Sequence, residues 1–281
     1  DEAEDSREER HIAIDGKSLR RTFDRAAGQS MLHLVSAWST ANGITLGQVA
    51  VDEKSNEITA IPRLLAIVDI RGATVTMDAM GNQKAIANAI IDGGGEYLLT
   101  VKGNQKKMQQ ILQETLAEHF ESDAPPPRGT RYETHEVKHG REETREYVSL
   151  PAPASLKKLG WSAVRSIGMV YSRTLRDGKV CEESRYYISS RRPNARKLAT
   201  FSRRHWSIEN NLHWVLDVSF HEDLCRLRTG HSPENLALLN RIAVSLLKAD
   251  QTVKAGIACK RKTAGWDDNY LIQLLLNNPS Y

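Results

Sequence analysis

The chain has 281 residues, of which 40% are hydrophobic and 26% are charged, and its formal net charge is +4 at pH 7. These proportions are typical of a soluble globular protein with one large domain or two ordinary ones. They exclude a membrane span, a secretory signal peptide and a disulfide framework, because no apolar run approaches ~20 residues, the start is acidic, and the three cysteines are scattered.

The first half of the chain predicts strands, followed by alternating strands and helices. Residues 1–10 form an acidic tail, and its start without Met predicts a fragment or a processed form. The connector Thr40–Gly43 contains Asn-Gly, a strong hairpin signal. Pro62 suits the first turn of one helix, and Gly93–Gly95 ends the next. The predicted strands are 11–15, 31–39, 44–52, 73–78 and 97–102, and the predicted helices are 58–68, 83–91 and 105–120.

This order of elements predicts an α/β fold with a mixed sheet flanked by helices. The central strands would run parallel through right-handed crossovers. Their carboxyl ends would then face one edge of the sheet, where open α/β sheets place their sites.

The pattern changes in the second half of the chain. The break at Ala124–Gly129 contains three prolines and precedes strand-like stretches, which predict a β-rich insertion at about 128–192. Helical character returns at Asn194, and the amphipathic helix 235–248 has Ser232 as its expected capping residue and Pro233 beside it. The predicted strands of the insertion are 132–148, 163–171 and 180–189, with a turn at 176–178, and another apolar run covers 271–276.

Charge is concentrated in one stretch of the chain. Residues 191–204 contain six arginines and lysines and no acid. Such a patch suits a nucleic-acid backbone, although composition alone favours a solvated positive face. Because Cys181, Cys225 and Cys259 do not form a disulfide pattern, a reducing, cytoplasmic setting is expected.

Three acidic residues are the strongest candidates for a functional site. Asp15 and Asp78 each end a predicted buried strand, and Glu209 lies in the helical stretch 204–214. A carboxylate at the exposed end of a buried strand is costly without a partner, and divalent metals are common partners. The three acids together predict a cage for two divalent ions, the apparatus that cuts phosphodiester bonds.

Each acid has a less specific explanation or a rival. Asp15 and Asp78 could be turn residues, and Asp69 is the main rival of Asp78. The rivals of Glu209 are nearby acids, and a zinc site on one helical face is a further alternative. The rivals are Asp217, Glu222 and Asp223, and the helical face would contain His205, Glu209 and His213.

Several long blocks resemble one protein family. They run in order through the chain from His11 to about Lys248, and they include IAIDGKSLRR, TMDAMGNQKAIANAI, LLTVKGNQ, KHGREETREY and HWSIENNLHWVLDVSFHEDLCRLR. The blocks resemble the DDE-type insertion-sequence transposases, and within them the H-repeat-associated group. The resemblance implies a ribonuclease-H-like catalytic domain over 11–281, with the β-rich insertion before the last catalytic helix.

The resemblance also implies a chemistry. Asp15, Asp78 and Glu209 would be the catalytic acids and the ligands of two Mg²⁺ ions, for which Mn²⁺ could substitute. The enzyme would cleave double-stranded DNA at transposon ends and transfer the 3′-hydroxyl to target DNA. A dimer on paired ends in the bacterial nucleoid is expected from the family. A structure-selective nuclease of the same fold and an inactive DNA-binding relic are the alternatives.

The sequence departs from related families around the glutamate. Their pattern Y-x2-R-x3-E-x6-K falls here on Ser202, His205, Glu209 and Leu216. Phosphate binding would therefore fall to Arg203, Arg204 or His213. Members of the group also continue further at the N-terminus, so recognition of DNA ends could be missing.

Other residues are weaker candidates for contacts with DNA. Lys17 and Lys102 follow strand ends on the expected active edge and would meet phosphates. Trp206 and Trp214 are expected in the core rather than stacked on bases. Further candidates are Arg141 and Arg145 in the insertion and Arg226 and Arg228 after the acidic helix.

Overall fold

The computed structural model describes residues 9–23, 28, 30–52, 56–122, 127–138, 140–161 and 163–276. The chain divides into two compact units. Unit 1 comprises Asp1–Asp69 and His205–Tyr281, and unit 2 comprises Ile70–Arg204. The acidic tail up to residue 8 and residues 124–126 of the predicted break lie outside the described residues.

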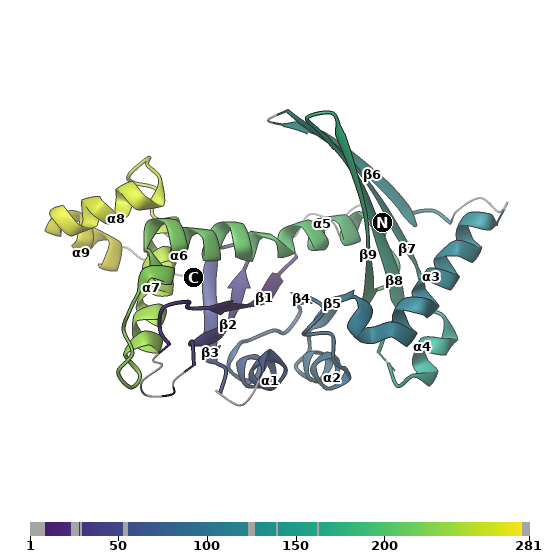
Figure 1. Cartoon of the computed structure of the whole chain (residues 1–281), viewed down its shortest axis with the longest axis horizontal. Helices are drawn as coiled ribbons and strands as arrows, with labels where there is room; N and C mark the ends of the chain where they lie inside the picture. Colours follow the sequence, from purple (N-terminus) through teal and green to yellow (C-terminus); the bar gives the residue numbers. More distant parts are fainter. Residues whose placement is uncertain are drawn as a thin grey trace. The chain divides into compact units, whose positions relative to one another are not determined.

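Three antiparallel strands form the sheet of unit 1. In the order β3-β2-β1 they pair side by side (Figure 1). The connector between β2 and β3 is the predicted hairpin, with Gly43 at φ 65°, a backbone conformation that glycine adopts readily. Asp15 pairs with Ser36 across the first two strands. The strands are β1 (His11–Ser18), β2 (His33–Ser39) and β3 (Ile44–Ala50).

Helices of unit 1 bury the apolar side chains of this sheet. Ala13 of β1 and Trp38 of β2 pack with Leu212, Leu216 and Val244 in one cluster. A second cluster joins the C-terminal helices through Leu247, Tyr270 and Leu274. The helical segments of unit 1 are α1 (Glu57–Ile67), the π-helical segment η2 (Glu209–His213), α6 (Trp214–Ser219), the 3₁₀ turn η3 (Glu222–Leu224), α7 (Ser232–Ala249), α8 (Ile257–Trp266) and α9 (Asp268–Leu276).

Unit 2 begins with a parallel strand pair and continues into antiparallel strands. Its strand order is β4-β5-β9-β8-β7-β6, and β4 and β5 are parallel. The strands are β4 (Thr74–Met77), β5 (Glu96–Val101), β6 (Arg131–Lys138), β7 (Arg141–Pro151), β8 (Ser166–Arg176) and β9 (Lys179–Ser189). Its helical segments are α2 (Lys84–Asp92), the 3₁₀ turn η1 (Gly103–Gln105), α3 (Lys106–Glu121), α4 (Ala154–Lys158) and α5 (Ala195–His205), the last of which ends at the first residue of unit 1.

The strands of the predicted insertion extend the sheet of unit 2. Strand β9 pairs antiparallel with β5, with Leu98 opposite Ser189. Strands β6 to β9 then run together as long neighbours (Figure 1). Helix α5 packs on them, because Leu198 and Phe201 share a cluster with Tyr147 and Tyr187. The start of α5 is thereby tied to the inserted strands.

The α/β class, the mixed sheet and the flanking helices are confirmed. Three local predictions are wrong. Strand β1 continues through Asp15 to Ser18, so Asp15 is inside the strand rather than at its end. The stretch 132–148 is two strands, because Gly140 at φ 71° allows a turn. Ser232 is the first residue of α7, and no side chain caps that helix. Helices α4 and α8 were not predicted.

No helix within the described ranges is both long enough and apolar enough to cross a membrane.

One buried carboxylate joins the last helices of unit 1. Asp250 follows α7, and its Oδ2 lies 3.2 Å from Lys260 Nζ of α8 and accepts a 2.9 Å hydrogen bond from Tyr270 Oη of α9. Its Oδ1 accepts from the Thr252 backbone N–H at 2.9 Å. Burial alone would raise the pKa of the Asp250 carboxyl, but the hydrogen bonds from Thr252, Tyr270 and Lys260 outweigh it and hold that pKa well below its usual range.

We expect Asp250→Asn to lower the free energy of unfolding by about 3–5 kcal/mol at neutral pH, because Lys260 loses its buried partner. A carboxylate with a depressed folded-state pKa contributes stability above its unfolded pKa of about 3.9, and the contribution is lost as the pH falls. The difference between wild type and variant, measured by urea unfolding, should therefore narrow below about pH 4. Asp268→Asn, at the exposed start of α9, is the control. A difference independent of pH would contradict this assignment.

Candidate functional site

Asp15 lies near the middle of β1, with its side chain 20% exposed. Its Oδ2 is 3.5 Å from Nδ1 of His213. This contact joins a strand near the start of the chain to the π-helical segment near residue 210. Two regions about 200 residues apart, each predicted to supply a catalytic residue, therefore meet within unit 1.

His213 makes this contact as a neutral side chain. Burial, together with the positive charges of Arg241 and Lys17, lowers the pKa of His213 to about 3. A neutral imidazole forms no ion pair, so the 3.5 Å approach is a weak polar contact. Its Nε2 is buried and has no hydrogen-bond partner among the described residues.

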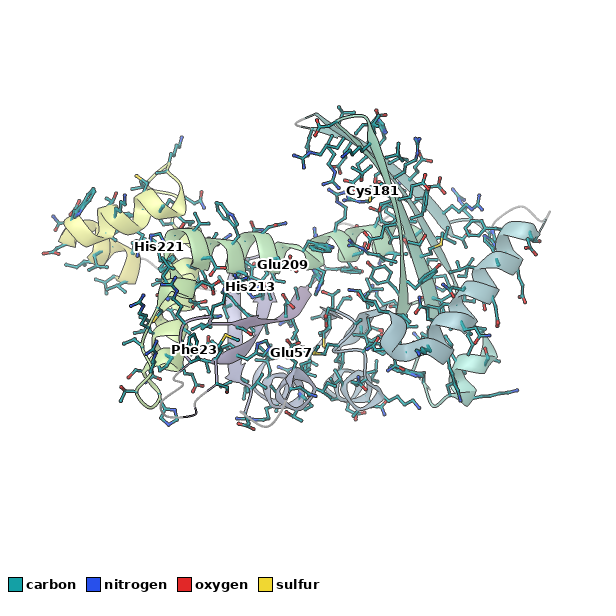
Figure 2. All side chains as sticks on the ribbon, in the orientation of Figure 1. Phe23, Glu57, Cys181, Glu209, His213 and His221 are labelled. Carbon is teal, nitrogen blue, oxygen red and sulfur yellow. The ribbon has the colours of Figure 1, made fainter. Side chains whose placement is uncertain are left out.

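Glu209 is the first residue of the π-helical segment and is exposed. The N–H of Trp214 bonds to the carbonyl of Glu209, which closes a turn one residue wider than an α-helical turn. Figure 2 shows Glu209 and His213 on this one stretch of ribbon. The segment that contacts Asp15 thus also carries the third predicted acid. Such π-helical turns occur frequently at functional sites.

The rivals of Glu209 are engaged in ion pairs. Asp217 and Asp223 both bind Lys17, and Glu222 binds Arg241. For Glu209, no side-chain hydrogen bond or ion pair is found within the described residues. The carboxylate that the family resemblance selected is therefore the one that is not used in packing.

Asp78 directly follows β4 in unit 2, at the strand end where it was predicted. Its Oδ1 accepts from the backbone N–H of Met80 at 2.9 Å and from that of Gly81 at 3.3 Å. This is the geometry of an aspartate that organises its own turn. Both explanations of the residue thus apply: one carboxylate oxygen fixes the loop, and the side chain lies at the strand end.

A second loop holds the Asp78 loop in place. Asn104 Nδ2 donates to the carbonyl of Ala79 at 2.7 Å, and Gln105 Nε2 donates to that of Asn82 at 2.9 Å. Asn82 Nδ2 in turn donates to the carbonyl of Thr100 at the end of β5. This Gly-Asn-Gln stretch lies in the family block LLTVKGNQ, and no role was predicted for it. Two amide side chains immediately after a buried strand were the signal that could have indicated a role in holding a neighbouring loop.

The three predicted acids fit a hard divalent cation by their chemistry. All offer carboxylate oxygens, which Mg²⁺ and Mn²⁺ prefer. Asp15 and Glu209 belong to unit 1 and Asp78 belongs to unit 2. In the part of the chain that is described, no three His, Cys, Asp or Glu side chains are grouped so that they could hold a metal ion.

Lys17 was predicted to meet phosphate, but its ammonium is bound inside unit 1. The side chain is 8% exposed, and Nζ lies 2.7 Å from Asp217 Oδ1 and 3.2 Å from Asp223 Oδ1. Arg20 adds a second contact to Asp223 at 3.2 Å. Lys17 therefore fastens β1 to α6 and η3.

A buried ion pair lies beneath the same sheet. Arg241 of α7 and Glu222 of η3 are 2.9 Å apart, each with a side chain 1% exposed. Arg241 also donates to Ser36 Oγ at 3.2 Å, and Ser36 is the strand partner of Asp15. No role was predicted for Arg241. An arginine among the apolar residues of helix 235–248 was the available signal.

The other predicted basic residues differ in their surroundings. Lys102 is exposed after β5, and Arg203 is bound to Glu136 at 2.9 Å. Arg204 is partly buried. In the insertion, Arg141 and Arg145 contact the same Glu143 oxygen at 2.9 and 2.8 Å. Arg226 is exposed, and Arg228 stacks over Phe23 at 5.7 Å.

The expected burial of two tryptophans is wrong. Trp206 is 42% exposed and Trp214 is 60% exposed. They flank the π-helical segment, whose buried face is provided by Ile208 and Leu212 instead. The helical stretch around Glu209 therefore presents large aromatic side chains to solvent.

Comparison with known proteins identifies the family. The model of the transposase DDE domain matches residues 6–246, a range that contains all three predicted acids. The chain belongs to this family. The domain therefore belongs to a DNA transposase, as its sequence blocks predicted.

Relatives in Escherichia coli are similar along most of the transposase chain. YhhI of strain K12 is named as a candidate H repeat-associated transposase. It is 39% identical to this chain, over 94% of this chain and 71% of its own length. YbfL of the same strain has the same identity and coverage. YncI of strain O157:H7, named as a candidate transposase, is 40% identical over 94% of this chain and 68% of its own length.

A weaker likeness exists to a solved structure. A piggyBac transposase synaptic complex with hairpin DNA matches the transposase with a TM-score of 0.44 and 10% sequence identity, over 95% of this chain and 52% of that one. A likeness at this level supports no conclusion about fold or function.

We expect Arg241→Met to lower the free energy of unfolding of the transposase by about 3–5 kcal/mol, because Glu222 is left buried and unpaired. Replacing both partners, as Arg241→Met with Glu222→Leu, removes the unpaired charge and should restore most of the loss. Urea unfolding of the two single variants and the double variant measures the coupling. Losses that simply add would show that the pair does not act as a unit.

Proposed function

We propose that this transposase domain cleaves DNA phosphodiester bonds at transposon ends and transfers the resulting 3′-hydroxyl to target DNA. The observation that carries the proposal is the contact between Asp15 and His213, on the same segment as Glu209. The neighbouring acids of Glu209 are bound in ion pairs, whereas its own carboxylate faces solvent. Family membership supports the assignment of Asp78 as the remaining acid.

The proposal includes two divalent cations held by Asp15, Asp78 and Glu209, with Mg²⁺ as the expected metal and Mn²⁺ as a substitute. When bound, such ions supply Lewis-acid stabilisation for an in-line displacement at phosphorus. The side chains themselves have simpler tasks. Asp78 is oriented by two backbone N–H groups, and Asp15 is restrained by the neutral imidazole of His213. Glu209 is exposed, so a ligand can reach it from solvent.

The proposed partner is double-stranded DNA in the bacterial nucleoid. Supporting features are the net charge of +4 and the acid-free run 191–204, because cationic side chains replace the counterions of a phosphate backbone. Exposed Lys102 and the basic side chains of α5 are candidate phosphate contacts. A dimer acting on paired transposon ends is part of the proposal and rests on family membership alone.

The first test is nicking of supercoiled plasmid in the presence of MgCl₂. Asp78→Asn is the sharpest variant, because asparagine keeps the oxygen that accepts from Met80 and Gly81 while the charge is lost. We expect the rate to fall at least about 100-fold, with an unchanged melting temperature. Asp92→Asn, at the end of α2, is the control acid in the same unit. Equal rates for wild type and Asp78→Asn would reject the assigned site, and inactivity of wild type itself would favour a DNA-binding relic.

The kind of DNA that is cleaved distinguishes a transposase from a structure-selective nuclease. Duplexes that end in the terminal repeats of the element, random duplexes and branched DNA can be compared at one Mg²⁺ concentration. Transposition predicts cleavage at the repeat ends and covalent joining of the 3′-hydroxyl to a second duplex. Cleavage of branched DNA alone, without joined product, would contradict the proposed reaction.

A further inference from the structure

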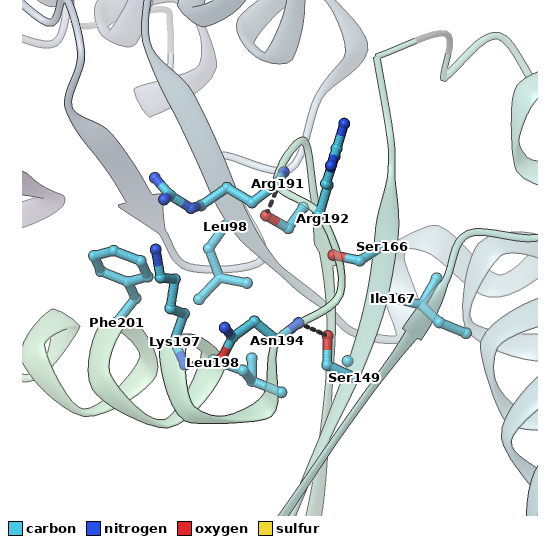
Figure 3. Close-up of a pocket in the computed structure, with 12 residues that line it drawn as sticks. Leu98, Ser149, Ser166, Ile167, Arg191, Arg192, Asn194, Lys197, Leu198 and Phe201 are labelled. Atoms are coloured by element: carbon cyan, nitrogen blue, oxygen red, sulfur yellow. Dashed lines mark hydrogen bonds between the residues drawn. The ribbon is translucent and has the colours of Figure 1, made fainter. Parts of the chain in front are cut away.

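Unit 2 contains a pocket where α5 begins against the inserted strands. Its walls come from β5, β7, β8, β9 and the first two turns of α5, and its volume is about 320 Å³ including the solvent-open mouth. Figure 3 shows the pocket with the side chains that line it. None of the three predicted catalytic acids lines it.

The chemistry of the lining selects an anion. Three cationic residues, Arg191, Arg192 and Lys197, line the pocket, and no Asp or Glu does. Ser166 adds a hydroxyl group, whereas the hydroxyl of Ser189 already donates to the Tyr97 carbonyl. An anion in this partly enclosed pocket is attracted by these charges more strongly than it would be in open water.

The side chain of Arg191 is held in position by its neighbours. Arg191 Nη1 donates to Thr74 Oγ1 at 2.9 Å, and its guanidinium lies 5.4 Å from the centre of the Phe201 ring. Its backbone N–H donates to Ser189 Oγ at 3.1 Å. Figure 3 shows Arg191 and Lys197 extending toward the side of Phe201, whereas Arg192 extends away from them at the rim.

The start of α5 is fixed at the same place. The N–H of Asn194 donates to Ser149 Oγ at 3.1 Å, and Asn194 Oδ1 accepts from the N–H of Lys197 at 2.9 Å. The side chain of Asn194 thus caps the helix, and the helix places its positive end beside the pocket. The positive end of the helix and the cationic side chains both favour a negative ligand.

We propose that this pocket binds a phosphate group of the DNA backbone. Guanidinium, ammonium and hydroxyl donors match the oxygens of a phosphate, and an open pocket can admit one group of a long polymer. Arg196 also lies along α5, exposed and 5.4 Å over the Tyr132 ring, so a neighbouring phosphate would meet further positive charge. The choice of DNA as the source of the phosphate rests on the proposed function.

The test is binding of a fluorescein-labelled DNA duplex to the full chain, by fluorescence anisotropy in EDTA over a series of KCl concentrations. We expect Arg192→Gln with Lys197→Gln to weaken binding and to reduce the slope of log affinity against log salt by about 1 to 2. The matched control is Lys157→Gln with Lys158→Gln on α4, which removes the same charge from an exposed helix of the same unit. The control should keep the wild-type slope.

Inorganic phosphate is the second probe. It should raise the melting temperature of wild type and of the control, but not that of the pocket variant. Phosphate could stabilise wild type and control but not the pocket variant, while the slope of log DNA affinity against log salt is the same in wild type, pocket variant and control. In that case the pocket binds free anions, and its assignment to DNA is overturned. Should the double variant fail to fold, Arg192→Gln alone changes an exposed rim residue and should still reduce the slope by about 0.9.

Failure of this proposal can be distinguished from failure of the proposed function. A wild-type protein that binds no DNA would overturn both. Equal slopes for wild type, pocket variant and control would overturn only the pocket assignment. Nicking that depends on Asp78 would still stand in that case, because EDTA separates the binding measurement from the metal-dependent reaction.

Discussion

Neutralisation of buried charge within unit 1 is the constraint on which the rest of its structure depends. Lys17, Asp217 and Asp223 are joined across β1, α6 and η3, and Arg241 and Glu222 are joined one layer deeper. Lys17, Arg241 and Glu222 are almost fully buried, and charges so far from water are tolerated only when each has a partner. Satisfying them brings the segment around residue 210 against β1, and it is this approach that lets His213 contact Asp15.

Unit 2 depends on a different set of contacts, which hold the Asp78 loop and extend the sheet beyond β5. Backbone N–H groups orient Asp78, and amide side chains after β5 hold the carbonyls of the same loop. On the other side of β5, strand β9 continues the hydrogen-bonded ladder, so the insertion is built on the same sheet as the Asp78 strand. The basic start of α5 is consequently attached to rigid strands.

Local patterns in the sequence predicted most elements, because strands and helices here have clear periodicity and turn residues. They failed where tertiary contacts decide. Strand β1 continues past Asp15 because the residues from Asp15 to Ser18 keep pairing with β2. The dipeptide Asp-Gly locally indicates a turn, so the sequence gives no sign of this pairing. Identifying Asp15, Asp78 and Glu209 required the family blocks, since spacing alone left rivals. Lys17 was assigned to phosphate from its place after a predicted strand end, because its partners Asp217 and Asp223 lie about 200 residues away and leave no local signal.

The π-helical turn at Glu209–His213 makes the number of residues in this segment as important as their identity. The wide turn takes up one more residue than a regular turn, so removing one would let the chain close turns of about 3.6 residues while the flanking helix kept nearly the same direction. The extra residue instead sets how Glu209 is placed relative to His213, which meets Asp15. A single-codon deletion here would thus shift Glu209 relative to His213, although every acidic residue would be retained.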